Sequence, residues 1–280
     1  MTVQRAARRR GRDTRAVRSS VIALASCIVV FGRLTWIVVN APGWPEVQTS
    51  FLNAQVFWDT LPGLLDAFII NIQLFVTAEV LVLIFGLGLA VMRSLHGPVF
   101  LPIRVLSNAY TDLFRAVPGV LVIFILGFGI PGLGLIDPKT DQRLFGILAL
   151  TLVYAAYVAE VYRAGIESIH PSQDAAARSL GLSRLQSLRH VVIPQAVRRV
   201  VPPLLNDFIG LQKDTVLVSF IGVVEIFRYS QIASAATFNF TPYVAVGLVF
   251  VVITVPLIHL VDWLAKRGFG SGATPSGAVR

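Results

Sequence analysis

Polar residues able to bind a small molecule are few in this chain, and the most regular set lies within an otherwise apolar segment. This set consists of Asn206, Asp207, Gly210, Lys213 and Asp214. On a helix, at 100° per residue, its members fall within about 120° of one another and form one polar stripe. The stripe presents both signs of charge, which suits a zwitterionic solute, and it equally suits hydrogen bonding to a neighbouring helix. Both interpretations, a substrate path and a structural contact, stay open.

A second charged pair, Glu160 and Arg163, has the three-residue spacing at which side chains meet on a helix. Ionisable groups at membrane depth are costly and normally face a protein interior or water. We interpret the pair first as an anchor between a membrane helix and the loop that follows it. Direct contact with a transported solute is the second interpretation.

Covalent and metal chemistry are not favoured by the remaining reactive residues. The four histidines, His96, His170, His190 and His259, share no ligand spacing, and Cys27 is the only cysteine. The chain also lacks the Gly-x-x-x-x-Gly-Lys-Ser/Thr loop that binds nucleotide phosphates. We therefore expect no enzymatic activity, no catalytic residue, no metal ion and no cofactor bound by this chain.

The elements that must carry the polar residues are membrane-spanning helices. Of the 280 residues, 55% are hydrophobic and only 14% are charged, against about 25% charged in soluble domains. The apolar residues gather into blocks long enough to cross a membrane. We identify Val21–Val39, Ala67–Met92, Val117–Leu135, Leu144–Tyr162, Val200–Val223 and Tyr243–Leu264. The sequence predicts an all-α membrane protein with about six transmembrane helices.

The distribution of basic residues predicts the orientation of these helices. The chain has 24 Lys and Arg against 15 Asp and Glu, a net charge of +9. Most of the basic residues fall in the segments that are cytoplasmic when both termini lie inside, as short cytoplasmic loops require. The charge therefore reflects topology, and no nucleic-acid partner is expected. Residues 1–20 are expected to be a basic cytoplasmic tail, 21–65 an added helix with an external loop, and 268–280 a flexible tail.

The cytoplasmic segment 163–199 has the pattern of two short helices joined at a glycine. Ser172 is a candidate N-cap of the first helix, and Gly181 suits its left-handed terminator. Ser183 and Gln186 have capping-box spacing for the second helix, and Pro194 is expected to end it. Such a capped elbow between two membrane helices predicts a surface that a partner moves.

At these residues the sequence resembles the permease subunits of type I ABC importers, in the polar amino-acid group. The matching segments are Phe114–Pro118, Ala156–Gly165, Ile169, Gln173, Ala176–Ser183, Val191–Ala196, Pro202–Asn206 and Lys213–Thr215. The resemblance covers about residues 66–267. It implies a core of five helices, so that 21–39 would be an addition before the core.

The family's loop signature is Glu-Ala-Ala, three residues, Gly, nine residues, then Ile-x-Leu-Pro. Its spacing is kept here, with Gly181 at the glycine, but Ala175 stands where the family has Glu, one position after Asp174. The resemblance implies that this loop contacts an ATPase. The implied coupling residues are Asp174, Ala175, Ala176, Ala177, Leu180, Gly181, Leu182, Val191, Ile193 and Pro194.

The resemblance also implies the rest of the assembly. ABC ATPase subunits would bind ATP and Mg²⁺, and an extracytoplasmic amino-acid-binding protein would deliver the solute. A second copy of this chain or a homologous permease would complete the pathway in the bilayer of a bacterial plasma membrane. The alternatives are an ATP-independent gated channel and a permease for another small polar solute.

Overall fold

The computed structural model describes residues 2–95, 97–134, 136–137 and 139–264, and within these residues it contains helices and turns but no strand. The chain divides into two compact units, Met1–Asn53 and Ala54–Arg280. We describe each unit by itself. The expected C-terminal tail, 268–280, lies outside the described residues.

The first unit consists of two helices, α1 (Thr2–Val39) and α2 (Trp44–Phe51). The part of α1 from Ser20 to Val39 is long and apolar enough to cross a membrane, and its side chains are exposed. This stretch coincides with the predicted span Val21–Val39. An apolar helix of this length suits a lipid environment.

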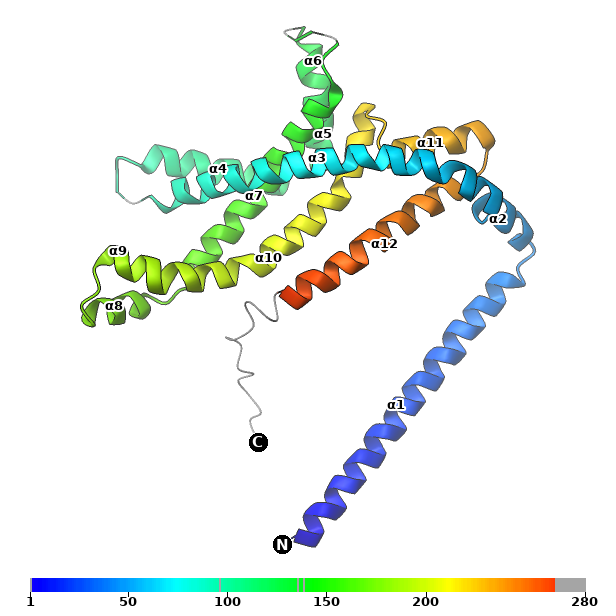
Figure 1. Ribbon diagram of the computed structural model, residues 1–280, viewed down its shortest axis with the longest axis horizontal. Coiled ribbons are helices and arrows are strands. Elements are labelled where there is room, and N and C mark those ends of the chain that lie inside the picture. Colours follow the sequence, from blue (N-terminus) through cyan, green and yellow to red (C-terminus); the bar gives the residue numbers. More distant parts are fainter. Residues whose placement is uncertain (1, 96, 135, 138, 265–280) are drawn as a thin grey trace. The chain divides into compact units, whose positions relative to one another are not determined.

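The second unit contains all the other helices (Figure 1). They are α3 (Ala54–Ser94), α4 (Leu101–Ala116), α5 (Gly119–Phe124), the π segment η1 (Ile125–Gly129), α6 (Ile130–Gly132), α7 (Gln142–Glu167), α8 (Pro171–Ser179), α9 (Arg184–Ser187), the π segment η2 (Leu188–Val192), α10 (Ile193–Asp214), the 3₁₀ segment η3 (Thr215–Ile221), α11 (Ile226–Thr237) and α12 (Thr241–Leu264). The segment expected to be a loop up to residue 65 is helical from Ala54 onward.

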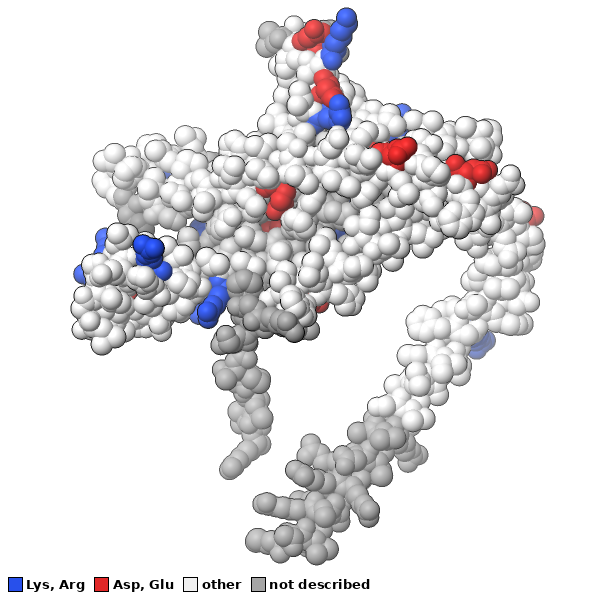
Figure 2. Space-filling model, viewed as in Figure 1, with Lys and Arg blue, Asp and Glu red and all other residues white. Residues whose placement is uncertain are grey.

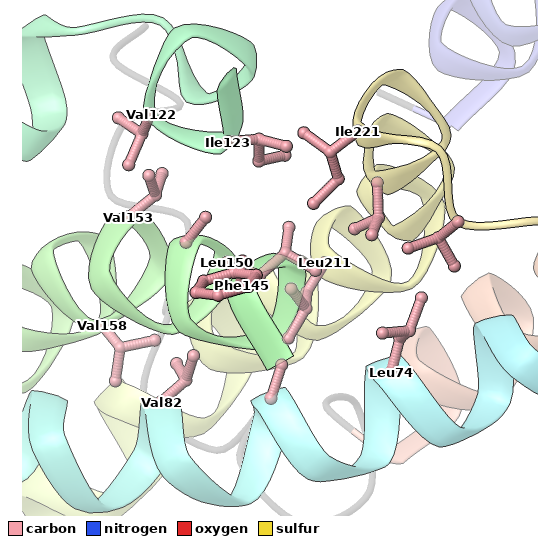
Figure 3. Packing of buried hydrophobic residues seen from close by; sticks show 14 residues of the cluster. Leu74, Val82, Val122, Ile123, Phe145, Leu150, Val153, Val158, Leu211 and Ile221 are labelled. Carbon is pink, nitrogen blue, oxygen red and sulfur yellow. The ribbon is translucent and has the colours of Figure 1, made fainter. Parts of the chain in front are cut away.

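The core of this unit forms where α3 crosses α7 and where α10 and η3 pack against both. Leu74 and Val82 of α3 face Leu150 of α7 and Leu211 of α10 (Figure 3). Gly146 permits a close approach, because a Cβ there would lie 2.4 Å from Val218 Cγ1. The apolar side chains of α3 and α7 pack against α10 and η3 in this core. This packing fixes the positions of the polar residues on α7 and α10.

Four described stretches are long and apolar enough to cross a membrane, and the number rises to six if two bent helix pairs each count as one span. The four are Ser20–Val39, Trp44–Ser94, Gln142–Glu167 and Thr241–Leu264. The two bent pairs are Leu101–Ala116 with Gly119–Gly132, and Arg184–Ile221 with Ile226–Thr237. They correspond to the third and fifth predicted spans, and the predicted first and last residues of those two spans were wrong. The multi-pass helical fold is therefore as predicted, with two spans broken.

The third span is broken because Val117 precedes a proline. Its extended backbone, at φ −85° and ψ 130°, follows from the steric clash that Pro118 imposes on the residue before it. The chain turns by 105° there, from α4 into Gly119–Gly132. Gly119–Gly132 alone covers about 21 Å at 1.5 Å per residue, short of the expected Val117–Leu135. Helix α4 itself was not predicted, since its polar face resembles a cytoplasmic connection.

The fifth span starts earlier and ends differently from the predicted Val200–Val223. Helix α10 begins at Ile193, so Pro202 and Pro203 lie inside it and not at its start. The final turns tighten into η3, which ends at Gly222 with a left-handed φ of +93°. A bend of 51° separates the stretch Arg184–Ile221 from α11.

Candidate functional site

The elbow between α8 and α9 is built by the caps that the sequence encodes. Gly181 has φ +89°; its N–H bonds to Arg178 O at 3.0 Å and the N–H of Leu182 bonds to Ala177 O at 3.3 Å. These two bonds form the Schellman ending of α8. Ser183 and Gln186 form the predicted capping box, with bonds of 2.9 and 3.3 Å.

Two local predictions for this loop were wrong. Helix α8 begins at Pro171, so His170, and not Ser172, occupies the N-cap position and accepts from the Ser172 N–H at 3.2 Å. Proline favours the first helical position, which moves the start upstream. Pro194 also does not end the second helix. The wider turn of η2 precedes it and relieves the clash of a proline ring with the preceding turn.

The loop has a buried face, where α8 packs against α9, and an exposed face. Asp174 accepts a hydrogen bond of 2.6 Å from the hydroxyl of Ser187, which is buried, and Ala177 is buried beside them. Leu180 and Leu185 are 86% and 74% exposed. Of the other implied coupling residues, Ala175, Ala176, Gly181, Ile193 and Pro194 are exposed, whereas Leu182 and Val191 are half-buried. The loop therefore exposes two leucines, one on each side of its capped turn.

The predicted Glu160–Arg163 ion pair is present, and it belongs to a larger cluster. Glu160 Oε2 also lies 2.8 Å from Arg93 Nη1 and 3.8 Å from Arg115 Nη1, and Arg93 Nε donates to Asn108 Oδ1 at 2.7 Å. The cluster ties α3 and α4 to α7, directly before the loop. Sequence reasoning missed Arg93, whose partner is far away in the chain.

The polar stripe of α10 lines a pocket of about 240 Å³ against α7 and α5. The lining residues are Gly119, Val153, Tyr154, Tyr157, Asn206, Asp207, Gly210, Asp214 and Leu217. Tyr154 donates a hydrogen bond of 2.8 Å to Asp214. The Oδ2 atom of Asp207 is buried and has no hydrogen-bond partner within the described part of the chain. Lys213 of the same stripe is exposed and does not line the pocket.

A buried carboxylate that sequence reasoning missed shares a hydrogen-bond network with the start of η3, directly after the C-terminal end of α10. Glu225 is 0% exposed and caps α11 by accepting from the N–H groups of Phe227 and Arg228 at 3.0 and 2.8 Å. It also accepts from Asn71 Nδ2 at 2.9 Å, and the same nitrogen donates to Thr215 Oγ1 at 3.0 Å. This network joins α3, η3 and α11 where the fifth span is broken.

The N-terminal end of α7 is capped by Asp141, which accepts from the N–H of Arg143 at 2.9 Å. Side-chain and backbone hydrogen bonds from Arg143 hold the pKa of the Asp141 carboxyl below its usual range. Elsewhere in the described ranges, no three His, Cys, Asp or Glu side chains come together as metal ligands would.

The second unit combines helices of membrane length, a polar pocket between α5, α7 and α10, and a capped elbow at α8 and α9, which is the architecture expected of a membrane transport subunit. Residues 99–268 match the family described as the inner membrane component of binding-protein-dependent transport systems. The chain belongs to this family, the permeases of ABC importers, and is a multi-pass protein of the plasma membrane. The permease itself is a non-enzymatic subunit.

Several relatives support this placement. The chain is 33% identical to a probable glutamine ABC transporter permease of Bacillus subtilis, over 77% of this chain and 98% of the relative. It is 37% identical to a glutamate/aspartate import permease of Escherichia coli, over 74% and 94%. Among solved structures, an amino acid ABC transporter crystallised with histidines matches with a TM-score of 0.68 and 29% identity, covering 76% of this chain and 97% of that one.

Proposed function

We propose that this chain is the permease subunit of an ATP-driven importer that carries polar amino acids across the plasma membrane. The observation that carries the proposal is the elbow of α8 and α9, whose capped turn exposes two leucines outside the helix bundle. Leu180 and Leu185 are 86% and 74% exposed on either side of the capped turn, and apolar surface rimmed by polar residues is typical of a protein interaction site. The substrate class rests on the relatives, whose names give glutamine, glutamate/aspartate and arginine.

In this proposal a separate ATPase binds ATP and Mg²⁺, and its closure moves the elbow. The chain lacks a phosphate-binding loop of its own, so the energy comes from that partner. An extracytoplasmic binding protein delivers the amino acid, and a second permease, identical or homologous, forms the other half of the pathway. Residues 66–267 are the transport domain, with the coupling loop at 163–199.

The pocket on α10 is proposed as part of the substrate path. Asp207 and Asp214 place carboxylates beside two tyrosine rings, a combination that suits the ammonium group of an amino acid. Asn206 adds amide donors and acceptors. Glu160 and Arg163 are proposed to anchor α7 to the loop, because their contacts run to Arg93 and Glu167 and not into this pocket.

Replacing Leu180 by Asp is expected to remove the ATPase from the complex. A charge at the centre of an apolar contact must be desolvated on binding, which costs at least about 3 kcal/mol. The measurement is the amount of ATPase that remains with the tagged chain after purification from membranes. Leu180→Met is the matched control, since it keeps an apolar side chain of similar volume and should retain the partner. Equal ATPase retention by Leu180→Asp and wild type would refute the coupling role.

A further inference from the structure

An apolar groove runs along the first turns of α10 and shares no residue with the polar pocket. It has a volume of about 280 Å³ and lies between α10, the last two turns of α7 and Leu87 of α3. Its lining positions on α10 run from Ile193 to Leu204, which is about 16 Å at 1.5 Å per residue. This length is close to half of a hydrocarbon core of about 30 Å. The groove therefore has the length of one membrane leaflet.

Two close contacts between helices form the walls of the groove. Gly165 of α7 leaves no room for a Cβ against Val200 of α10, and Gly86 of α3 leaves none against Val158 of α7. Leu87 directly follows Gly86, so the groove opens beside the point where α3 and α7 touch. The side chains at its mouth are only half covered, at 46–49% exposure: Leu87, Ile166, Ile193 and Val197. The groove is thus preformed in this chain and open on one side.

Two arginines flank the groove on α10. At 100° per residue the lining positions cover about 140° of the helix, and Arg198 and Arg199 fall about 60° beyond its two edges. Both are exposed, and neither forms an ion pair within the described part of the chain. Arg199 donates to the Ser168 carbonyl, which leaves its charge without a counter-ion. Long helical side chains point toward the N-terminus, so both guanidinium groups reach toward the Ile193 end of the groove.

The acid closest to this end of α7 does not compensate the two arginines. Glu167 is paired with Arg163, at 2.6 Å. Lys and Arg atoms predominate over Asp and Glu atoms at the end of the second unit where α8, α9 and the start of α10 lie (Figure 2). An apolar groove with cations at its opening therefore calls for an occupant with an anionic head and an apolar chain.

We propose that this groove binds one acyl chain of an anionic phospholipid from the cytoplasmic leaflet, with the lipid phosphate beside Arg198 and Arg199. The distribution of basic residues predicts that the Ile193 end of α10 is cytoplasmic, and anionic lipids attract Arg at that surface. The topology accounts for arginines in this segment. It does not account for their position on both sides of an apolar groove of one-leaflet length. The lipid site goes beyond the proposed function and does not depend on amino-acid import.

Arg198→Gln tests the site for the lipid phosphate. Phosphatidylglycerol is titrated into the delipidated complex in neutral detergent, and bound lipid is counted by native mass spectrometry. We expect about fivefold weaker binding than wild type, because one arginine near a lipid headgroup contributes about this factor. Arg198→Lys should bind as wild type does. The matched control is Arg184→Gln, which removes the same charge from an exposed position on α9. Equal losses in Arg184→Gln and Arg198→Gln would assign the lipid to the general positive charge and overturn the proposal.

Val197→Trp tests the groove itself, because it fills the mouth and keeps both arginines. Displacing about two methylene groups of the acyl chain weakens binding about tenfold, and we expect at least this loss of affinity for phosphatidylglycerol. Val197→Ile keeps the groove open and should bind as wild type does. Unchanged affinity in Val197→Trp would overturn the proposal. If Val197→Trp releases a second permease from the complex and lipid binding is unchanged, the groove is a contact between permeases and the lipid site is rejected.

Discussion

Replacing Glu225 by Ala is expected to lower the free energy of unfolding by about 3 kcal/mol. The side chain is fully buried and accepts three hydrogen bonds, two from the start of α11 and one from Asn71. Alanine removes the cap of α11 and leaves the Asn71 amide with only part of its bonding. The network lies at the bend between η3 and α11, where the fifth span is broken. Its loss should therefore leave the relative position of these two helices less well fixed.

The measurement is equilibrium unfolding of the purified chain in mixed micelles. Glu225→Gln keeps an oxygen acceptor for the cap and should cost clearly less than Ala. Asp112→Ala removes an exposed carboxylate of α4 and should stay within about 0.5 kcal/mol of wild type. A Glu225→Ala variant as stable as Asp112→Ala would show that the network does not hold the break together.

Neutralising the pocket carboxylates should lower transport at least about tenfold, because a hydrogen bond to a charged group contributes about 1.5–3 kcal/mol. Asp214→Asn keeps an acceptor for the Tyr154 hydroxyl, so the local geometry survives and only the charge is lost. Asp207→Asn tests the carboxylate whose Oδ2 is buried without a partner. The measurement is the uptake of labelled amino acid by the complete complex in proteoliposomes.

The matched control is Lys213→Gln, on the same helix but exposed and outside the pocket. We expect uptake by this variant within about twofold of wild type, since surface substitutions are usually mild. Assembly with the ATPase is measured on the same preparations. If the Asp variants lose assembly together with uptake, the carboxylates are structural and the pocket is not the substrate path.

Features encoded by neighbouring residues were predicted well from the sequence. The caps at Gly181, Ser183 and Gln186 depend on contacts a few residues apart, so spacing alone reveals them. The apolar stretches are equally local, and helices cover most of each predicted block within the described residues, with the third block interrupted at Val117 and Pro118 and the fifth ending before Gly222. The start of α8 was misplaced because the proline at position 171 outweighed the serine that follows it.

Features that depend on distant partners were not predictable in the same way. Glu225 and Asn71 are far apart in the sequence, and Arg93 and Glu160 lie on different helices. Nothing in the residues around Glu225 distinguishes it from an exposed carboxylate of an external loop. The stripe on α10 was found from periodicity, but its partners Tyr154 and Tyr157 could be assigned only once α7 was placed against α10.

The most direct test of the account is ATP-dependent uptake by a complex that contains this chain. The tagged chain is purified from membranes with its partners and reconstituted into proteoliposomes with ATP on the side of the ATPase. The account predicts accumulation of a labelled polar amino acid with ATP and the binding protein, and none without ATP or with the Leu180→Asp chain. Equal uptake with and without ATP would contradict the account and support a gated channel.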